Sequence, residues 1–223
     1  MSFLAVFDLD GTLVDSAPLT VAILCRMLAD RGAAARVTLA RARRHISVGG
    51  EAMILALVGE ACGPPAEAVV EFRARLAATP TPPSSLYRGV RAGLGRLFSR
   101  GVGLAVHSNK PQALCEKVLG ELGLSHLFDA VVGGGAGSAP KPDPLGFDKA
   151  LALTGASRAA SCYIGDSELD HGVAQRAGVP FVLARYGYGE ENARFPGAFV
   201  AGRFAEVPPI VERLLAAPRE RAA

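Results

Sequence analysis

The amino-acid sequence predicts an α/β fold in which a doubly wound parallel sheet is interrupted once by a block of helices. Short apolar runs alternate with helix-like segments over most of the chain, a pattern typical of βαβ units and a parallel sheet. Residues 16–84 break this alternation, because they contain helical patterns and no convincing strand. The chain has 223 residues and is 50% hydrophobic, which is enough for a large core.

Strands are expected where a short apolar run is bounded by turn residues, since such a run is typical of a strand buried on both faces. The runs of this kind are Phe3–Phe7, Gly103–Val106, Ala130–Val132, Cys162–Ile164 and Phe181–Leu183. Helices between the later runs are expected at Pro111–Leu122, Pro144–Thr154 and Asp170–Ala177. Gly123 and Gly178 stand where helix C-caps are expected.

The helical block contains the amphipathic segments Leu19–Arg31, Leu39–Ile46, Ala52–Ala61 and Ala66–Ala77. Asp15–Pro18 opens it, and the proline-rich Thr79–Ser85 closes it with the composition of a stiff linker. We therefore expect an α/β core of residues 1–15 and 85–223 and a helical cap of residues 16–84. With hinges at both edges the cap would be a lid over the sheet; the alternative is that its helices pack permanently on the sheet.

The charge pattern gives little sign of a nucleic-acid partner, and we expect none. The formal net charge is +3 and aromatic residues make up 6% of the chain, whereas nucleic-acid binders usually have a strongly basic face with interleaved aromatics. The basic residues cluster once, at Arg36, Arg41, Arg43 and Arg44. This cluster favours a solvated helix face, and the alternative is a weak positive field that draws an anionic substrate.

The cysteines and the apolar stretches indicate a cytoplasmic protein without a membrane partner. Cys25, Cys62, Cys115 and Cys162 are far apart, which argues against a zinc site and against a disulfide framework. No apolar stretch is long enough to span a bilayer, and the N-terminus lacks a basic region followed by a long apolar segment.

Two aspartates follow the first expected strand directly. Because side chains at i and i+2 of an extended segment point the same way, Asp8 and Asp10 should converge at the carboxyl end of that strand. In open α/β sheets this is the edge at which ligands bind. Carboxylates this close repel each other, so a cation or a shared proton should be present. The alternative is an Asx-type turn in which both carboxylates cap the backbone.

Three further strand ends carry polar residues that favour a catalytic site. Ser108 is either a turn residue or a hydroxyl donor to an anion, and Lys141 is held between two prolines. Asp166 would be a third carboxylate at the same edge, and together with Asp8 and Asp10 it would make an oxygen site of the kind that Mg²⁺ favours. The pattern predicts phosphoryl transfer, with Ser108 and Lys141 facing the phosphoryl oxygens. For Asp170 the simple interpretation is a helix N-cap.

Four motifs, in order, resemble those of the haloacid dehalogenase superfamily. They are Asp8–Thr12, Ser108–Pro111, Lys141–Pro144 and Gly165–Asp170. The resemblance covers nearly the whole chain and is specifically to the phosphoglycolate-phosphatase-like branch, which has a helical cap inserted after the first motif. It implies a Rossmann-like core and a magnesium-dependent phosphatase that acts on a small phosphorylated metabolite.

The resemblance also implies a role for each motif residue. Asp8 would attack phosphorus and form an aspartyl phosphate, and Asp10 would act as acid and base while lending Mg²⁺ its backbone carbonyl. Asp166 would complete the metal shell. Ser108 would bind the phosphate, and Lys141 would neutralise the developing charge.

The remaining implied roles are supporting ones. Asp170 would orient Lys141, Thr12 would support the phosphate or Asp10, and Asn109 would contact the substrate. Arg44 and His45, beside a glycine-containing cap loop, are candidates to meet the far end of the substrate, although a cap arginine is more often solvent-facing.

Two other functions stay open at this stage. A phosphomutase of the β-phosphoglucomutase kind typically carries a histidine- and tryptophan-containing segment at the cap entrance, and residues 15–21 contain neither residue. A dehalogenase is less favoured, because those enzymes typically lack the second aspartate of the first motif. The second function that stays open, from a different class, is a binding protein that kept the fold and lost catalysis. A monomer or a homodimer is expected.

Overall fold

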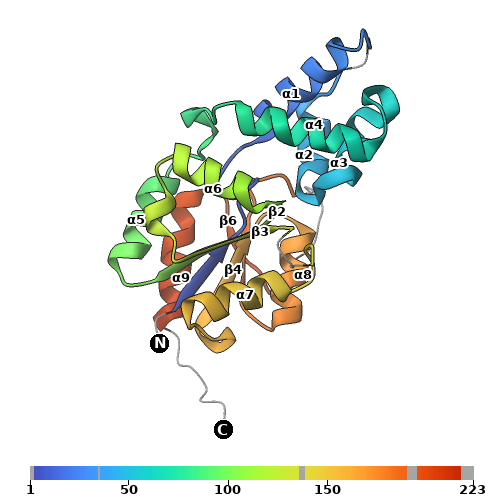
Figure 1. The fold of residues 1–223 in the computed structure, drawn as a ribbon. Coiled ribbons are helices and arrows are strands. Elements are labelled where there is room, and N and C mark those ends of the chain that lie inside the picture. Colours follow the sequence, from blue (N-terminus) through green and yellow to red (C-terminus); the bar gives the residue numbers. More distant parts are fainter. Residues whose placement is uncertain (1–2, 35, 136–138, 190–194, 217–223) are drawn as a thin grey trace.

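The computed structural model describes residues 3–34, 36–135, 139–189 and 195–216. Its centre is a parallel sheet with the strand order β3-β2-β1-β4-β5-β6, the order of a doubly wound fold (Figure 1). The strands are β1 (Leu4–Phe7), β2 (Gly103–Pro111), β3 (Ala130–Gly134), β4 (Ser161–Gly165), β5 (Phe181–Ala184) and β6 (Phe199–Ala201). The predicted fold class is confirmed.

The sheet is covered by helices on both faces. Ala5 and Phe7 of β1 belong to a hydrophobic cluster shared with the helices α5 (Val90–Ser99), α6 (Gln112–Glu121) and α9 (Val207–Ala216). Leu4 and Val6 belong to a second cluster on the opposite face, shared with α7 (Leu145–Thr154) and α8 (Glu168–Ala177). The unbroken apolar run of the first strand therefore reflects burial on both sides.

The register of the central strands decides which residues meet. Phe7, the last residue of β1, pairs with Val106 of β2 and with Ile164 of β4. Because all three strands are parallel, the residues that follow them leave the sheet at one edge. Asp8, Ser108 and Asp166 are thereby brought to the same place.

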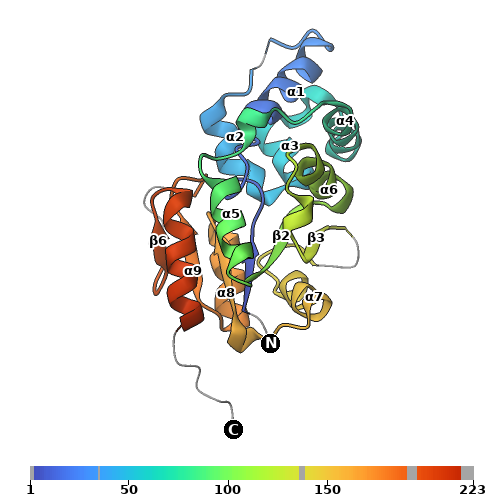
Figure 2. The same cartoon turned by 90° about the vertical axis from the view of Figure 1, so that its left-hand side faces the viewer.

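Four α-helices lie beyond this edge (Figures 1 and 2). Along the chain they are inserted between β1 and α5. They are α1 (Ala17–Ala29), α2 (Leu39–His45), α3 (Gly50–Val58) and α4 (Pro65–Ala78). They share a hydrophobic cluster of their own, to which only Leu114 and Tyr188 are added from outside residues 16–84 in the described part of the chain. This separate core supports the predicted cap.

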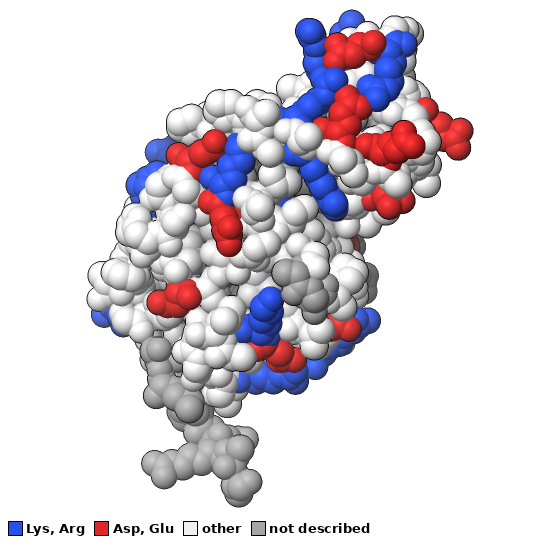
Figure 3. Space-filling view, viewed as in Figure 1, with Lys and Arg blue, Asp and Glu red and all other residues white. Residues whose placement is uncertain are grey.

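The surface of the cap carries both signs of charge side by side (Figure 3). Arg75 forms ion pairs with Asp30 and with Glu71, and Arg31 pairs with Glu71 as well. Arg43 of α2 pairs with Asp15 at the start of the cap, at 2.8 Å. With the pair between Arg26 and Asp30, four of the eight arginines between residues 16 and 84 are thus paired with a carboxylate.

In the described residues, no single helix is long and apolar enough to cross a membrane. One pair, Gly50–Cys62 and Pro65–Ala78, passes that test only when taken together, and its two members meet at a bend of 103°.

Three elements were not predicted from the sequence. Strand β6 has three residues at the edge of the sheet, too few for a periodic signal. Helix α5 contains Gly93 and Gly95, which lower helix propensity, and α9 begins at Val-Pro-Pro. Packing stabilises all three, since α5 and α9 lie together against one face of the sheet and Ala201 of β6 belongs to the same hydrophobic cluster.

Candidate active site

The carboxylate of Asp8 lies at the end of β1 in contact with a single lysine. Lys141 Nζ donates to Asp8 Oδ1 at 2.7 Å and to Asp170 Oδ1 at 2.6 Å, and all three side chains are at most 3% exposed. Burial raises the pKa of Asp8 above its ordinary value, although Lys141 acts in the opposite direction. Burial also opposes the charge of Lys141, but Asp170 and Asp8 outweigh it and hold the pKa of Lys141 well above its ordinary value.

The carboxylate of Asp166 is completely buried and only half satisfied. Its Oδ2 accepts a hydrogen bond from the backbone N–H of Tyr188 at 2.5 Å. Its Oδ1 has no hydrogen-bond partner among the described residues. Burial, with the nearby charges of Asp170 and Asp8, raises the pKa of Asp166 well above its ordinary value. An orphaned buried carboxylate oxygen is costly, which indicates a missing partner.

Carboxylate oxygens of Asp8, Asp166 and Asp170 all lie within 4.8 Å of one another. Lys141 contacts only Asp8 and Asp170 of these three groups, so one lysine cannot balance all three carboxylates when they are ionised. Oxygen donors in this number suit a hard divalent cation such as Mg²⁺. The residues present therefore fit the metal that the sequence predicts.

Asp170 is oriented by the start of α8. Ser167 is the N-cap of this helix and Asp170 is its N3 residue, and the two form a capping box. Asp170 Oδ2 accepts hydrogen bonds from Ser167 Oγ at 2.6 Å and from the N–H groups of Ser167 and Asp166. The alternative interpretation of Asp170 as the N-cap is wrong, because Ser167 occupies that position. The other oxygen, Oδ1, is left for Lys141.

Gly11 allows the side chain of Asp166 to pack against the Asp8–Thr12 segment that follows β1. Its φ is +89°, a conformation that side chains rarely adopt. A Cβ there would overlap the Asp166 carboxylate and lie 2.9 Å from the ring of Tyr188. Glycine is thus required at this position both by the positive φ and by the closeness of Asp166 and Tyr188.

Asp10 does not belong to this group of carboxylates and is paired with a second lysine. Lys110 Nζ donates to both oxygens of Asp10, at 2.9 and 2.7 Å, and the two side chains are 10% and 9% exposed. Burial opposes the charge of Lys110, but Asp10 outweighs it and raises the pKa of Lys110. Lys110 belongs to the second motif, but no role was predicted for it from the sequence. Its side chain meets Asp10 because β2 continues to Pro111, past Val106, where its pairing with β1 ends.

Three other predicted residues surround this edge. Ser108 is buried, and its Oγ accepts from the N–H of Lys110 at 3.3 Å. Thr12 is buried as well, and its hydroxyl has no partner among the described residues. Asn109 bridges two segments: its Oδ1 accepts from the N–H of Lys141 at 2.8 Å, and its Nδ2 donates to the carbonyl of Ser47 in the cap at 3.2 Å.

His107 lies beneath the site rather than in it. It is 2% exposed, and its Nδ1 lies 3.1 Å from the hydroxyl of Tyr163. Burial, followed by the charge of Lys141, lowers the pKa of His107 to about 3. The ring is therefore neutral at physiological pH.

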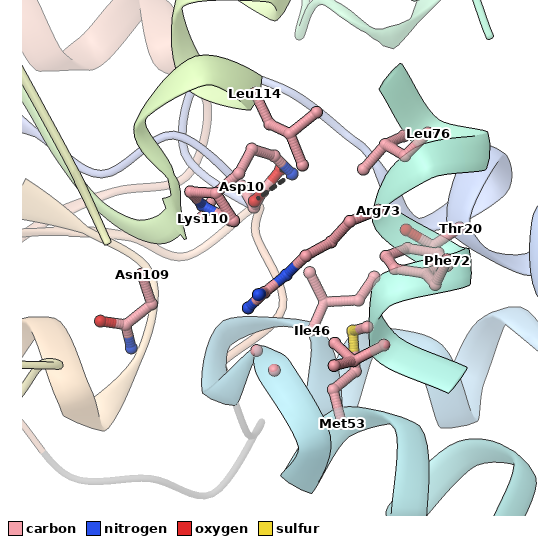
Figure 4. Close-up of a pocket in the computed structure, with 14 residues that line it drawn as sticks. Asp10, Thr20, Ile46, Met53, Phe72, Arg73, Leu76, Asn109, Lys110 and Leu114 are labelled. Carbon is pink, nitrogen blue, oxygen red and sulfur yellow. Dashed lines mark hydrogen bonds and ion pairs between the residues drawn. The ribbon is translucent and has the colours of Figure 1, made fainter. Parts of the chain in front are cut away.

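A pocket opens between the core and the cap above Asp10 (Figure 4). Asp10, Lys110 and Asn109 line it from the core. The cap contributes mainly apolar residues and one charged residue: Thr20, Ile46, Gly49, Gly50, Met53, Val69, Phe72, Arg73 and Leu76. Arg44, predicted from the sequence to meet the substrate, is exposed on α2 and does not line this pocket, nor does His45.

Comparison with known proteins agrees with this geometry. The model of the haloacid dehalogenase-like hydrolase family matches residues 5–184. A phosphoglycolate phosphatase of Cereibacter sphaeroides (strain ATCC 17025) is 36% identical over 217 residues, which cover 95% of this chain and 98% of the relative. A phosphoglycolate phosphatase of Xanthomonas campestris pv. campestris (strain 8004) is 35% identical over 207 residues, 92% of each chain. The chain belongs to the haloacid dehalogenase-like hydrolase family.

Solved structures show the same fold. A crystal structure of a predicted phosphoglycolate phosphatase from Haemophilus somnus superposes with a TM-score of 0.80 at 24% identity, covering 94% of this chain and 97% of the other. CbbY from Rhodobacter sphaeroides, solved in complex with phosphate, superposes with a TM-score of 0.77 at 21% identity, covering 93% and 96%. The resemblance inferred from the four motifs is confirmed at the level of family and fold.

Proposed function

We propose that this protein is a magnesium-dependent phosphatase that hydrolyses a small phosphate monoester, with phosphoglycolate as the first substrate to test. The observation that carries the proposal is the buried edge where Asp8 contacts Lys141 while one oxygen of Asp166 has no partner among the described residues. Relatives named phosphoglycolate phosphatase, at 36% and 35% identity over nearly the whole chain, support the substrate class.

In the proposed reaction, a carboxylate oxygen of Asp8 attacks phosphorus and the bond from phosphorus to the ester oxygen breaks. For this step Asp10 must exchange its ion pair with Lys110 for a proton, which it gives to the departing oxygen, so the product leaves as an alcohol. Water then attacks the phosphorus of the aspartyl phosphate, and Asp10 takes up the proton of that water. Inorganic phosphate leaves and the Asp8 carboxylate is restored. The intermediate replaces one difficult displacement by two easier ones.

Other residues hold the phosphoryl group and its charge. Lys141 and Ser108 would contact the phosphoryl oxygens, and Asp170 keeps Lys141 beside Asp8 through its 2.6 Å contact. Asp8, Asp166 and the backbone carbonyl of Asp10 would hold Mg²⁺, which supplies positive charge next to the phosphate when bound. Thr12 would support the phosphate or Asp10, and Asn109, which contacts the backbone of Lys141 and of Ser47, would contact the substrate.

The test is release of inorganic phosphate from phosphoglycolate by the purified protein, with Mg²⁺ and after treatment with a chelator. Release that needs Mg²⁺ and disappears in the Asp8→Asn protein, while its circular dichroism stays unchanged, supports the proposal. Activity that survives chelation would contradict the metal-assisted reaction. Isomerisation of a sugar phosphate without release of phosphate would identify a mutase instead, and binding without turnover would identify a silent binder.

A further inference from the structure

Arg73 of helix α4 faces the pocket from the cap. It lines this pocket and an adjoining hollow that also includes Asn109 and Pro111. Figure 4 shows its guanidinium group extending away from α4 toward the core, into the space between Asn109 and the Lys110–Asp10 pair. Gly50, on helix α3, lies next to this group, since a Cβ there would be in ordinary contact with Arg73 Nη2, at 3.9 Å.

Arg73 differs from its neighbours in having no ion-pair or hydrogen-bond partner among the described residues. Arg75, on the same helix, points to another face and pairs with Asp30 and Glu71. Lys110, the other cation of the pocket, is already neutralised by both oxygens of Asp10. In the described part of the pocket, Arg73 is therefore the cation whose charge is not balanced by the protein.

The surroundings of Arg73 favour an anion over a neutral group. Ile46, Phe72 and Leu76 form an apolar wall on the cap side of the pocket. Apolar walls lower the local dielectric and strengthen the attraction between opposite charges. A guanidinium group also matches the two oxygens of a carboxylate in a bidentate pair.

We propose that Arg73 determines specificity by binding a second anionic group of the substrate, a carboxylate, while the phosphate lies at Asp8. This rests on the proposed function, because that function places the phosphate at the sheet edge. Under this proposal the contact with the far end of the substrate, expected from the sequence at Arg44, is made instead by Arg73 of α4. The preferred substrates are then short phosphate esters that carry a carboxylate.

The test compares phosphoglycolate with ethyl phosphate, a similar ester without the carboxylate. For Arg73→Gln, kcat/KM for phosphoglycolate should fall about 10- to 100-fold, mainly through KM, and that for ethyl phosphate should change less than about 3-fold, as expected for loss of a charged hydrogen bond. Arg73→Lys should restore part of the loss. Arg26→Gln removes the same charge from an exposed site on α1 and should leave both values unchanged.

Equal losses for both esters in Arg73→Gln would overturn the proposal, since Arg73 would then act on the phosphate or on the fold. An unchanged preference for phosphoglycolate would also overturn it. Isothermal titration calorimetry of both esters with the Asp8→Asn protein measures their binding affinities in the absence of turnover. The same measurement on the Asp8→Asn, Arg73→Gln double variant shows whether Arg73 strengthens the binding of phosphoglycolate alone. If the wild type hydrolyses neither ester, the proposed function fails, and the binding preference still decides the role of Arg73.

Discussion

Replacing Gly11 by alanine tests whether Asp166 must lie where the structure places it. The substitution has two costs. The left-handed backbone at φ +89° costs an L side chain about 1–2 kcal/mol. The new Cβ would also overlap the carboxylate of Asp166, which is 0% exposed and has no space to retreat without moving Tyr188.

Gly32 provides the matched control. It has φ +66°, and a Cβ at this position would have nothing within 4 Å, so Gly32→Ala carries the backbone cost alone. A displacement of about 1 Å at a catalytic group can cost about 100-fold in rate, and we expect Gly11→Ala to lose at least that much kcat.

Phosphate release and thermal unfolding are to be measured for both variants with saturating Mg²⁺. Gly32→Ala should lose about 1 kcal/mol of stability and no activity. If Gly11→Ala keeps activity within about threefold of the wild type and is as stable as Gly32→Ala, Asp166 need not lie where the structure places it, since a displacement of about 1 Å should cost far more.

Further outcomes follow from the buried charges. The folded-state pKa of His107 is depressed to about 3, so the unfolded chain takes up a proton below its ordinary pKa near 6.5 and stability is lost as the pH falls below that value. From pH 6.5 to 5 this group should cost the wild type about 2 kcal/mol in urea unfolding. His107→Gln should lack this loss, and equal pH slopes for the two proteins would contradict the assignment. Lys141→Met leaves Asp8 and Asp170 buried without their shared cation, and it should cost about 3–5 kcal/mol of stability and abolish phosphate release. A Lys141→Met protein as stable as the wild type would show that the carboxylates are neutral in the fold. Asp166→Asn should remove the rise in Tm that Mg²⁺ gives the wild type, and an unchanged rise would place the ion elsewhere.

The sequence predicts those parts of the site that depend on strand ends. Asp8, Ser108 and Asp166 each follow an apolar run, and parallel pairing in register is sufficient to bring them together. The pattern of apolar runs gives no information about the direction of long side chains. The contact between Lys110 and Asp10 spans 100 residues and depends on how far β2 continues past His107.

The cap shows the same limit more clearly. Amphipathic periodicity predicts α4 over Ala66–Ala77, close to the observed Pro65–Ala78. It does not predict which polar residue beside Phe72 and Leu76 faces the core, because that depends on how the whole cap docks onto Asn109 through Ser47. Arg44, chosen from the sequence for its place beside a glycine-containing loop, lies on the exposed side of α2.

The central claim is that Asp8 forms a bond to the transferred phosphoryl group. Acid quenching of the protein during turnover of phosphoglycolate, followed by mass spectrometry of its peptides, tests this directly. We expect one added phosphoryl group on the peptide that contains Asp8, lost on treatment with hydroxylamine and absent from Asp8→Asn. Turnover with no phosphorylated peptide under conditions that trap other acyl phosphates, or a phosphoryl group on a different residue, would contradict it.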